Sequence, residues 1–271
     1  MRYEPKKDGK YTYIDIGRGT PVIILHGLMG GLSNFDRVIE ALCDNGYRAI
    51  VPSLPLYTIS MLKASVKGLS SYLHSFIKRL QLTDDFYLLG NSLGGHISLV
   101  YTRRHPHSVK GIVLTGSSGL YENTGSTYPK RSSRTYIEEK TREVFYDPAI
   151  ATPELIDEVY DIVNDRSKVL HTLHISKSAL HHNMEKDLPH IDKPTLLIWG
   201  KNDVVTPMEV GEHFHRLMPH STLHVIDKCG HAPMMEHPTT FNDLLLRWLS
   251  EKESYSSYLR EKQLSPSLVT T

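Results

Sequence analysis

Short apolar runs recur along the chain, each closed by turn residues, at intervals suited to strands separated by helices. They are too short and too uniformly apolar for hairpins that turn one face to water. Strands buried on both faces of a mostly parallel sheet, with helices packed on either side, have this composition. The pattern therefore predicts an α/β fold with core strands at residues 22–25 (VIIL), 49–51 (AIV), 86–89 (FYLL), 112–114 (IVL), 196–199 (LLIW) and 223–226 (LHVI).

An alternating stretch precedes the first of these runs. Residues 11–16 (YTYIDI) alternate between the two faces of an extended chain. We expect an edge strand here, paired antiparallel with residues 22–25 through a turn at residues 17–21.

Apolar residues at helical spacing fill several gaps between the runs. Residues 59–80 carry one apolar face, which predicts a helix packed on the sheet. A second helix follows Ser92 and ends at Arg103 and Arg104 before Pro106, where cations suit a helix C-terminus and proline cannot continue it. Residues 238–249 predict a last core helix, and the polar tail beyond Glu251 is expected to fray.

The stretch at residues 120–193 breaks this rhythm. It holds no convincing strand, and helical patterns occur at residues 134–145, 153–163 and 166–182. So long a passage within an α/β domain is better explained as a helical insertion than as a loop. We expect a core domain of residues 1–119 and 194–271, with residues 120–193 forming a helical cap between two late core strands.

Charge and composition narrow the class of protein. Lys plus Arg (31) nearly balance Asp plus Glu (30), which argues against a nucleic-acid partner. No apolar run approaches the ~18 residues that span a bilayer, and the N-terminus has no signal-peptide core. Two cysteines make no disulfide framework, and the 16 histidines lack cysteine partners at metal-ligand spacing. We expect a cytoplasmic protein with no membrane, metal or cofactor, acting on a small molecule; a homodimer is left open.

The segment Gly90-Asn91-Ser92-Leu93-Gly94 follows one predicted strand at once and opens a helix. A nucleophilic serine on such a sharp bend needs small neighbours two residues away on both sides, and two glycines supply them. The helix that starts beneath the hydroxyl favours a nearby negative charge. An ordinary glycine-rich turn is the alternative explanation.

A serine hydroxyl needs a base, and the base needs an orienting acid. Asp203 and His231 each lie just past a predicted parallel strand, at the same sheet edge as Ser92. The order Ser, Asp, His along the chain is also the one expected for this kind of turn. Asp227, close to His231 in sequence, is the rival acid.

With these residues in place, the chain resembles the α/β-hydrolase superfamily from about residue 11 to residue 249. The motifs are HG at 26–27, GNSLGG at 90–95, GKND at 200–203 with a proline at 207, and GHAPMMEHP at 230–238. The resemblance implies Ser92 as nucleophile, His231 as general base and acid, and Asp203 as its orienting acid. It also implies an oxyanion hole formed by the backbone N–H groups of Leu28 and Leu93, with His26 and Gly27 shaping that loop.

The reaction is open within this superfamily. A serine nucleophile argues against epoxide and haloalkane hydrolysis, which use a carboxylate there, and favours a carboxylic ester as the main hypothesis. Carbon–carbon bond hydrolysis is the alternative, because Asn91 and the Ser33-Asn34-Phe35 segment resemble meta-cleavage product hydrolases; Asn34 and Asn91 become candidate substrate-binding residues.

Two features depart from that pattern: LMGGL after the HG motif, and Ala232 where a tryptophan is usual. The loop PSLP at 52–55 departs from the superfamily as a whole, which commonly has an aspartate and glycines there. Acyl transfer and non-catalytic ligand binding are further alternatives.

Cap residues add one further question. Lys130, Arg131, Arg134, Lys140 and Arg142 would favour an anionic substrate if they faced the site, but we interpret them as a solvated helix face. The cap tyrosines either line a pocket or pack the cap; they are Tyr121, Tyr128 and Tyr136.

Overall fold

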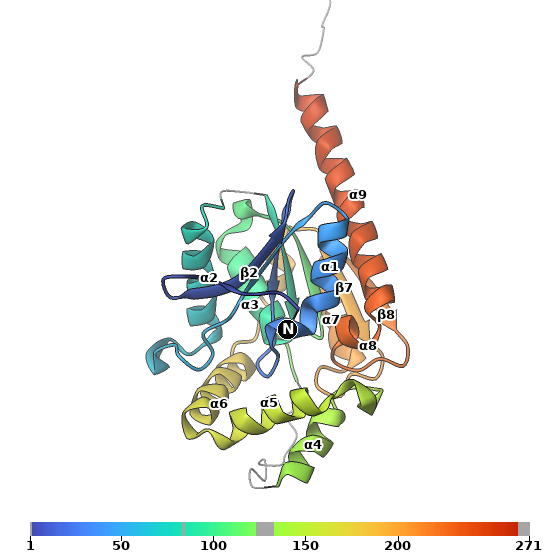
Figure 1. Cartoon of the computed structure of the whole chain (residues 1–271). Helices are drawn as coiled ribbons and strands as arrows, with labels where there is room; N and C mark the ends of the chain where they lie inside the picture. The colour runs from blue at the N-terminus through green and yellow to red at the C-terminus, as the bar shows by residue number, and fades with distance from the viewer. Residues whose placement is uncertain (1, 83–84, 123–132, 265–271) are drawn as a thin grey trace, which may run out of the picture.

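The computed structural model describes residues 2–82, 85–122 and 133–264, with side chains up to residue 255. Within them an eight-stranded sheet has the order β1-β2-β4-β3-β5-β6-β7-β8, with helices on both faces (Figure 1). The strands are β1 Lys6–Asp8, β2 Tyr11–Gly17, β3 Pro21–Leu25, β4 Arg48–Pro52, β5 Phe86–Asn91, β6 Val109–Thr115, β7 Thr195–Gly200 and β8 Ser221–Ile226. All the predicted core strands are confirmed. The edge strand β8 is nevertheless only half-buried.

The helices are α1 Asp36–Asp44, α2 Val66–Arg79, α3 Leu93–Arg104, α4 Arg134–Arg142, α5 Pro153–Asn164, α6 Arg166–His181, α7 Met208–Leu217, α8 Pro233–Glu236 and α9 Pro238–Leu264. Short 3-10 turns lie between them, at Leu32–Phe35, Met61–Lys63, Pro106–Ser108, Pro148–Ile150 and Leu188–His190. No helix within the described ranges is long and apolar enough to cross a membrane.

The N-terminal pairing differs from our expectation. Strand β2 runs antiparallel to β4, with Ile14 opposite Val51, and not to β3. The reason is that β3 is a central strand, whose two hydrogen-bonding edges are taken by the parallel strands β4 and β5. Strand β1 lies outside β2, so β2 is not the edge either.

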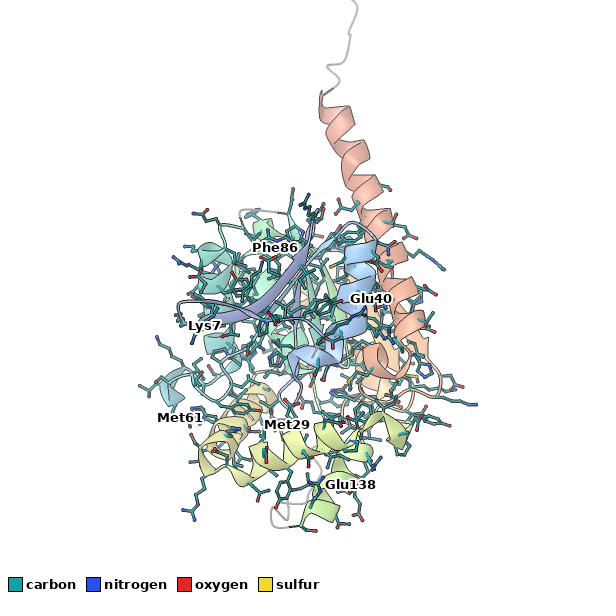
Figure 2. All side chains as sticks on the ribbon, viewed as in Figure 1. Lys7, Met29, Glu40, Met61, Phe86 and Glu138 are labelled. Carbon is teal, nitrogen blue, oxygen red and sulfur yellow. The ribbon has the colours of Figure 1, made fainter. Side chains whose placement is uncertain are left out.

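Side chains along the central strands alternate between the two faces of the sheet, and each face has its own hydrophobic core. In β3, Ile23 and Leu25 pack toward α2, α3 and α7, whereas Val22 and Ile24 pack toward α1, α8 and α9. Both sets are fully buried because helices cover both faces. Figure 2 shows Phe86 inside this body, with Met61 and Glu138 at its outer edges.

Two helix boundaries also differ from the sequence prediction. Helix α2 begins at Val66 and not at residue 59, because the Ser65 hydroxyl accepts a hydrogen bond from the Gly68 amide and caps it. The preceding 3-10 turn leaves Leu62 almost fully exposed. Helix α9 continues to Leu264, past the expected frayed end, since residues 251–264 contain no glycine or proline and Lys110 pairs with Glu253 at 2.6 Å.

Helices α4, α5 and α6 follow β6 and precede β7, the place where a cap was predicted. Figure 1 shows the three together at one end of the sheet. Helix α4 packs on α5 and α5 on α6, around a small core that contains Ile137, Val163 and Val169. The exact domain limits stay a prediction.

Candidate active site

Ser92 occupies the bend between β5 and α3. Its backbone has φ 53° and ψ −120°, a region that residues other than glycine rarely adopt. A Cβ on Gly90 would lie 2.4 Å from the Gly94 carbonyl carbon, and one on Gly94 would lie 2.0 Å from the Leu25 oxygen. The two glycines are therefore required by the bend, as the motif predicts.

His231 and Asp203 form a buried pair. His231 Nδ1 lies 2.8 Å from Asp203 Oδ2, and both residues are buried. Asp203 Oδ1 accepts hydrogen bonds from the backbone amides of Val205 (2.8 Å) and Thr206 (2.9 Å). The Thr206 hydroxyl donates to Oδ2 at 2.9 Å. Both oxygens of this carboxylate are fixed, so it accepts a hydrogen bond from Nδ1 of His231 and holds the imidazole in a defined tautomer.

The rival acid lies elsewhere. The Asp227 side chain is 68% exposed and pairs with Lys201 at 3.1 Å. Asp203 is therefore the carboxylate that orients His231.

Two kinds of effect on the pKa of His231 oppose each other. Burial acts to lower its pKa, but the charge and hydrogen bond of Asp203, together with the charges of Glu122 and Glu236, outweigh burial, so the pKa is raised. An imidazole with a raised pKa is a stronger base toward a serine proton.

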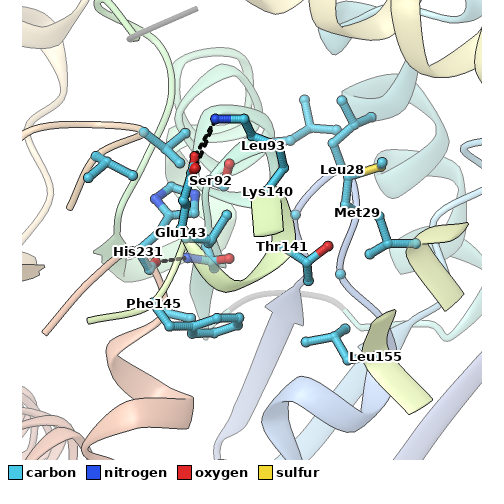
Figure 3. Close-up of a pocket in the computed structure, with 18 of the residues that line it drawn as sticks. Leu28, Met29, Ser92, Leu93, Lys140, Thr141, Glu143, Phe145, Leu155 and His231 are labelled. Atoms are coloured by element: carbon cyan, nitrogen blue, oxygen red, sulfur yellow. Dashed lines mark hydrogen bonds and ion pairs between the residues drawn. The ribbon is translucent and has the colours of Figure 1, made fainter. Parts of the chain in front are cut away.

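Ser92 and His231 line one cavity of about 640 Å³ (Figure 3). Core and cap both contribute to its wall, and most of that wall is apolar. Its described apolar side chains include Leu28, Met29, Leu93, Ile137, Val144, Phe145, Leu155, Val159, Val163 and Met235. The arrangement presents a serine, a buried His–Asp pair and an apolar chamber to a small molecule.

The chain matches the family model described as the alpha/beta hydrolase fold over residues 20–238, which is most of its length. The chain belongs to the α/β-hydrolase family. It is accordingly a hydrolase.

Similar proteins agree with this assignment. A 2-hydroxy-6-oxononadienedioate/2-hydroxy-6-oxononatrienedioate hydrolase of Pseudomonas putida is 32% identical over 268 residues, 88% of this chain and 91% of its own. An Escherichia coli enzyme of that name is 30% identical over 270 residues, 91% and 93% of the two chains. Among solved structures, an α/β-hydrolase enzyme from a sediment metagenome of the Mar Chica lagoon, Morocco, is 48% identical, with a TM-score of 0.77 and coverage of 92% and 99%.

The oxyanion hole of this α/β-hydrolase stays a prediction. Leu28 and Leu93 both line the cavity, and Figure 3 shows Leu93 beside Ser92 and Leu28 beside Met29. The Leu28 loop is shaped by His26, whose Nδ1 lies 2.8 Å from the Gly27 oxygen and whose Nε2 accepts from the Leu54 amide at 3.2 Å. Burial lowers the pKa of His26, which suits this neutral, doubly bonded imidazole.

The two candidate substrate-binding asparagines differ. Asn91 Nδ2 donates to the backbone oxygens of Thr115 (3.0 Å) and His231 (3.1 Å), so its amide hydrogens fasten the His231 loop to β6. Asn34 lines the cavity near Gly30. Substrate binding by Asn34, and by the Asn91 oxygen, stays a prediction.

Cap residues divide between solvent and cavity. Arg134 pairs with Asp157, and Arg142 with Glu138, on the solvated face that we expected. Lys140 is solvated too, with its side chain 47% exposed, but it also lines the cavity and pairs with Glu143 at 2.6 Å (Figure 3).

Of the cap tyrosines, Tyr136 lines the cavity and Tyr121 is exposed. Tyr128, Lys130 and Arg131 lie outside the described residues.

Sequence reasoning missed Thr206 and Glu122. Thr206 follows Asp203 by three residues, the spacing at which a hydroxyl and amide reach back to a carboxylate, so its signal was available. Glu122 stands just after β6, in a segment without periodicity, and no sequence signal placed it at the cavity.

Proposed function

We propose that this α/β-hydrolase hydrolyses a carbon–carbon bond beside a ketone, in a substrate of the 2-hydroxy-6-oxo-dienoate class. The observation that carries the proposal is the similarity to relatives named 2-hydroxy-6-oxononadienedioate hydrolases, which extends over about nine-tenths of both chains. The Ser92, His231 and Asp203 geometry supplies the chemistry that such a reaction needs.

The steps follow from that geometry. Ser92 gives its proton to His231 and attacks the ketone carbon, and the amides of Leu28 and Leu93 stabilise the oxyanion; losing one such donor typically costs ~3 kcal/mol. Once the carbon next to the ketone has gained a proton, its bond to the carbonyl carbon breaks and the electron pair leaves as a dienolate. The dienolate takes the proton that His231 received from Ser92, so that His231 is again a base. Water activated by His231 hydrolyses the acyl-serine, while Asp203 stabilises the imidazolium.

The cavity wall bears on the choice of substrate. Its described cation, Lys140, is already paired with Glu143, and Glu122 adds a second carboxylate. A dianionic substrate would bring another carboxylate next to Glu122 and Glu143, where the described lysine of the cavity wall is already paired. We therefore expect an uncharged, apolar group on the ketone to be preferred over a carboxylate-bearing arm.

Ester hydrolysis is the second candidate. The specific observation in its favour is the same apolar wall with its paired cation, which suits a neutral ester at least as well as an acid. An ester also needs no proton transfer beyond the one that His231 performs.

Turnover of two substrate types tests the proposal. We expect the purified protein to bleach the dienol absorbance of 2-hydroxy-6-oxohepta-2,4-dienoate and release acetate, with KM lower than for 2-hydroxy-6-oxononadienedioate. Ser92→Ala should abolish turnover with its circular dichroism unchanged. A p-nitrophenyl ester series runs beside it. Ester turnover without dienol loss would replace the proposal with an esterase, and no turnover of either would favour acyl transfer or ligand binding.

A further inference from the structure

Glu122 enters the same cavity as Ser92 and His231 but belongs to neither the triad nor the predicted oxyanion hole. It is half-buried, at the start of the segment that leads from β6 to the cap. Burial raises the pKa of this carboxyl; the His231 charge and a Ser118 hydrogen bond act to lower it, and the Asp203 charge acts to raise it. The group thus holds its proton to a higher pH than a surface glutamate.

A line of polar side chains, formed by Ser118, His96 and His182, leads from Glu122 toward the protein surface. Ser118 hydrogen-bonds to Glu122, and its Oγ lies 3.5 Å from Nδ1 of the fully buried His96. His96 Nε2 lies 3.0 Å from Nδ1 of His182. His182 is half-buried at the C-terminus of α6, where Lys67, Asp187 and Arg104 contribute charge.

The spacing of these groups allows the donors to share one direction. Burial, with the neighbouring His182 adding to it, lowers the pKa of His96 to about 3, so His96 is neutral and has one donor and one acceptor nitrogen. In one tautomer His182 Nδ1–H donates to His96 Nε2, His96 Nδ1–H donates to Ser118 Oγ, and the Ser118 hydroxyl donates to Glu122. In that tautomer every hydrogen points toward the cavity carboxyl, which is the arrangement that passes a proton inward.

Carbon–carbon bond cleavage requires a proton donor, and a protonated carboxyl in the cavity is one. In a conjugated dienol the carbon next to the ketone must gain a proton before its bond to the carbonyl can break heterolytically, and ester hydrolysis has no such step. We propose that Glu122 is the acid that protonates this carbon, and that Ser118, His96 and His182 return the proton from the surface; this rests on the proposed function.

The step balances in protons. The Glu122 O–H bond breaks as the new C–H bond forms, while the 2-hydroxyl of the substrate releases its proton to water. Glu122 then takes the Ser118 proton, Ser118 takes the one from His96 Nδ1, and His96 Nε2 takes the one from His182 Nδ1. His182 is reprotonated from solvent, and no electrons change hands.

Deuterium exchange in a non-cleaving background tests the proposal directly. With Ser92→Ala in heavy water, 2-hydroxy-6-oxohepta-2,4-dienoate should gain deuterium at the carbon next to the ketone. NMR measures the rate of this exchange. Adding Glu122→Gln, which keeps the shape and removes the acid, should slow exchange on the order of 10²-fold. Adding Glu139→Gln, an exposed cap residue away from the cavity, should leave the exchange rate within about twofold.

The line itself gives a second readout. His182→Gln in the same background should slow the exchange, and added imidazole should restore it by delivering protons in place of the missing side chain. A structural role for His182 would not respond to imidazole. In addition, exchange should decline as the pH rises through the Glu122 pKa, and the variant that carries Glu122→Gln should lack that decline.

Each outcome decides between two statements. Exchange that is unchanged by Glu122→Gln overturns the role of Glu122, even if the wild type cleaves the substrate. Exchange that depends on Glu122, with no cleavage by the wild type, keeps the acid and rejects the proposed function. Exchange absent from Ser92→Ala itself overturns the role as well, because the proton donor is intact there.

Discussion

At the scale of single residues, Asp203 shows how hydrogen bonds fix the orientation of a carboxylate in the site. Its two oxygens take hydrogen bonds from two backbone amides, one hydroxyl and the His231 ring. A carboxylate held in this way cannot rotate without breaking several bonds at once. The imidazole is therefore held in one orientation at Nδ1, and its other nitrogen is the one that we expect to take the Ser92 proton.

Asp203→Asn tests this directly. The amide cannot stabilise the imidazolium and favours the wrong tautomer, so kcat should fall on the order of 10⁴-fold. The acid limb of kcat/KM should also move to lower pH. His231 must be neutral to accept a proton. Burial acts to lower its pKa, and the pKa is raised because the Asp203 charge and hydrogen bond, with the charges of Glu122 and Glu236, together outweigh burial. Steady-state kinetics across pH measure both effects.

Asp227→Asn is the matched control, since it removes an exposed carboxylate near His231 in sequence. It should leave kcat within about twofold and the acid limb in place. If Asp227→Asn is the more damaging change, the acid assignment is wrong.

At the scale of elements, local signals set most boundaries and tertiary contacts set the rest. Residues 59–65 have helical periodicity, yet the chain starts α2 only after the Ser65 cap. Helix α3 begins directly after Ser92, because the bend at Ser92 leaves the next residue in helical geometry. The caps decide where a helix begins when the apolar pattern alone allows more than one start.

Removing the α2 cap should cost stability. Ser65→Ala leaves the Gly68 amide without its side-chain acceptor, and such changes cost about 1 kcal/mol. Urea unfolding followed by circular dichroism measures the loss. Ser60→Ala, at the start of a 3-10 turn without a side-chain cap bond, should shift the free energy of unfolding by less than about 0.5 kcal/mol. Equal effects of the two changes would argue against the cap.

At the scale of the whole molecule, the sheet and the cap share one cavity. The far end of the sheet is closed by α9, where Trp248 packs edge-on against Tyr87 at 5.7 Å between ring centres. A Cβ on Gly111 would lie 2.7 Å from that indole, so the strand and the helix are fitted closely there. This packing is remote from Ser92 and serves the fold.

Trp248→Ala should accordingly lower the free energy of unfolding by about 3–5 kcal/mol, because a large buried ring leaves a cavity behind. Thermal and urea unfolding give the value. On the same helix Tyr255 is 62% exposed, and Tyr255→Ala should change stability by less than about 0.5 kcal/mol. A loss below about 1 kcal/mol for Trp248→Ala would mean that α9 does not close the core.

The sequence by itself determined the core strands, the bend at Ser92, the helices between β6 and β7, and the meeting of Asp203 with His231 at the cavity that Ser92 lines. The catalytic roles of the three residues stay a prediction. These follow from short-range rules: apolar runs, glycines at a sharp turn, and strand ends that meet at one sheet edge. Which strand lies beside β2, which cap residues reach the cavity, and the line from Glu122 to His182 depended on the tertiary structure. Such contacts join segments far apart in the chain, and no local pattern records which of the available edges and faces will meet.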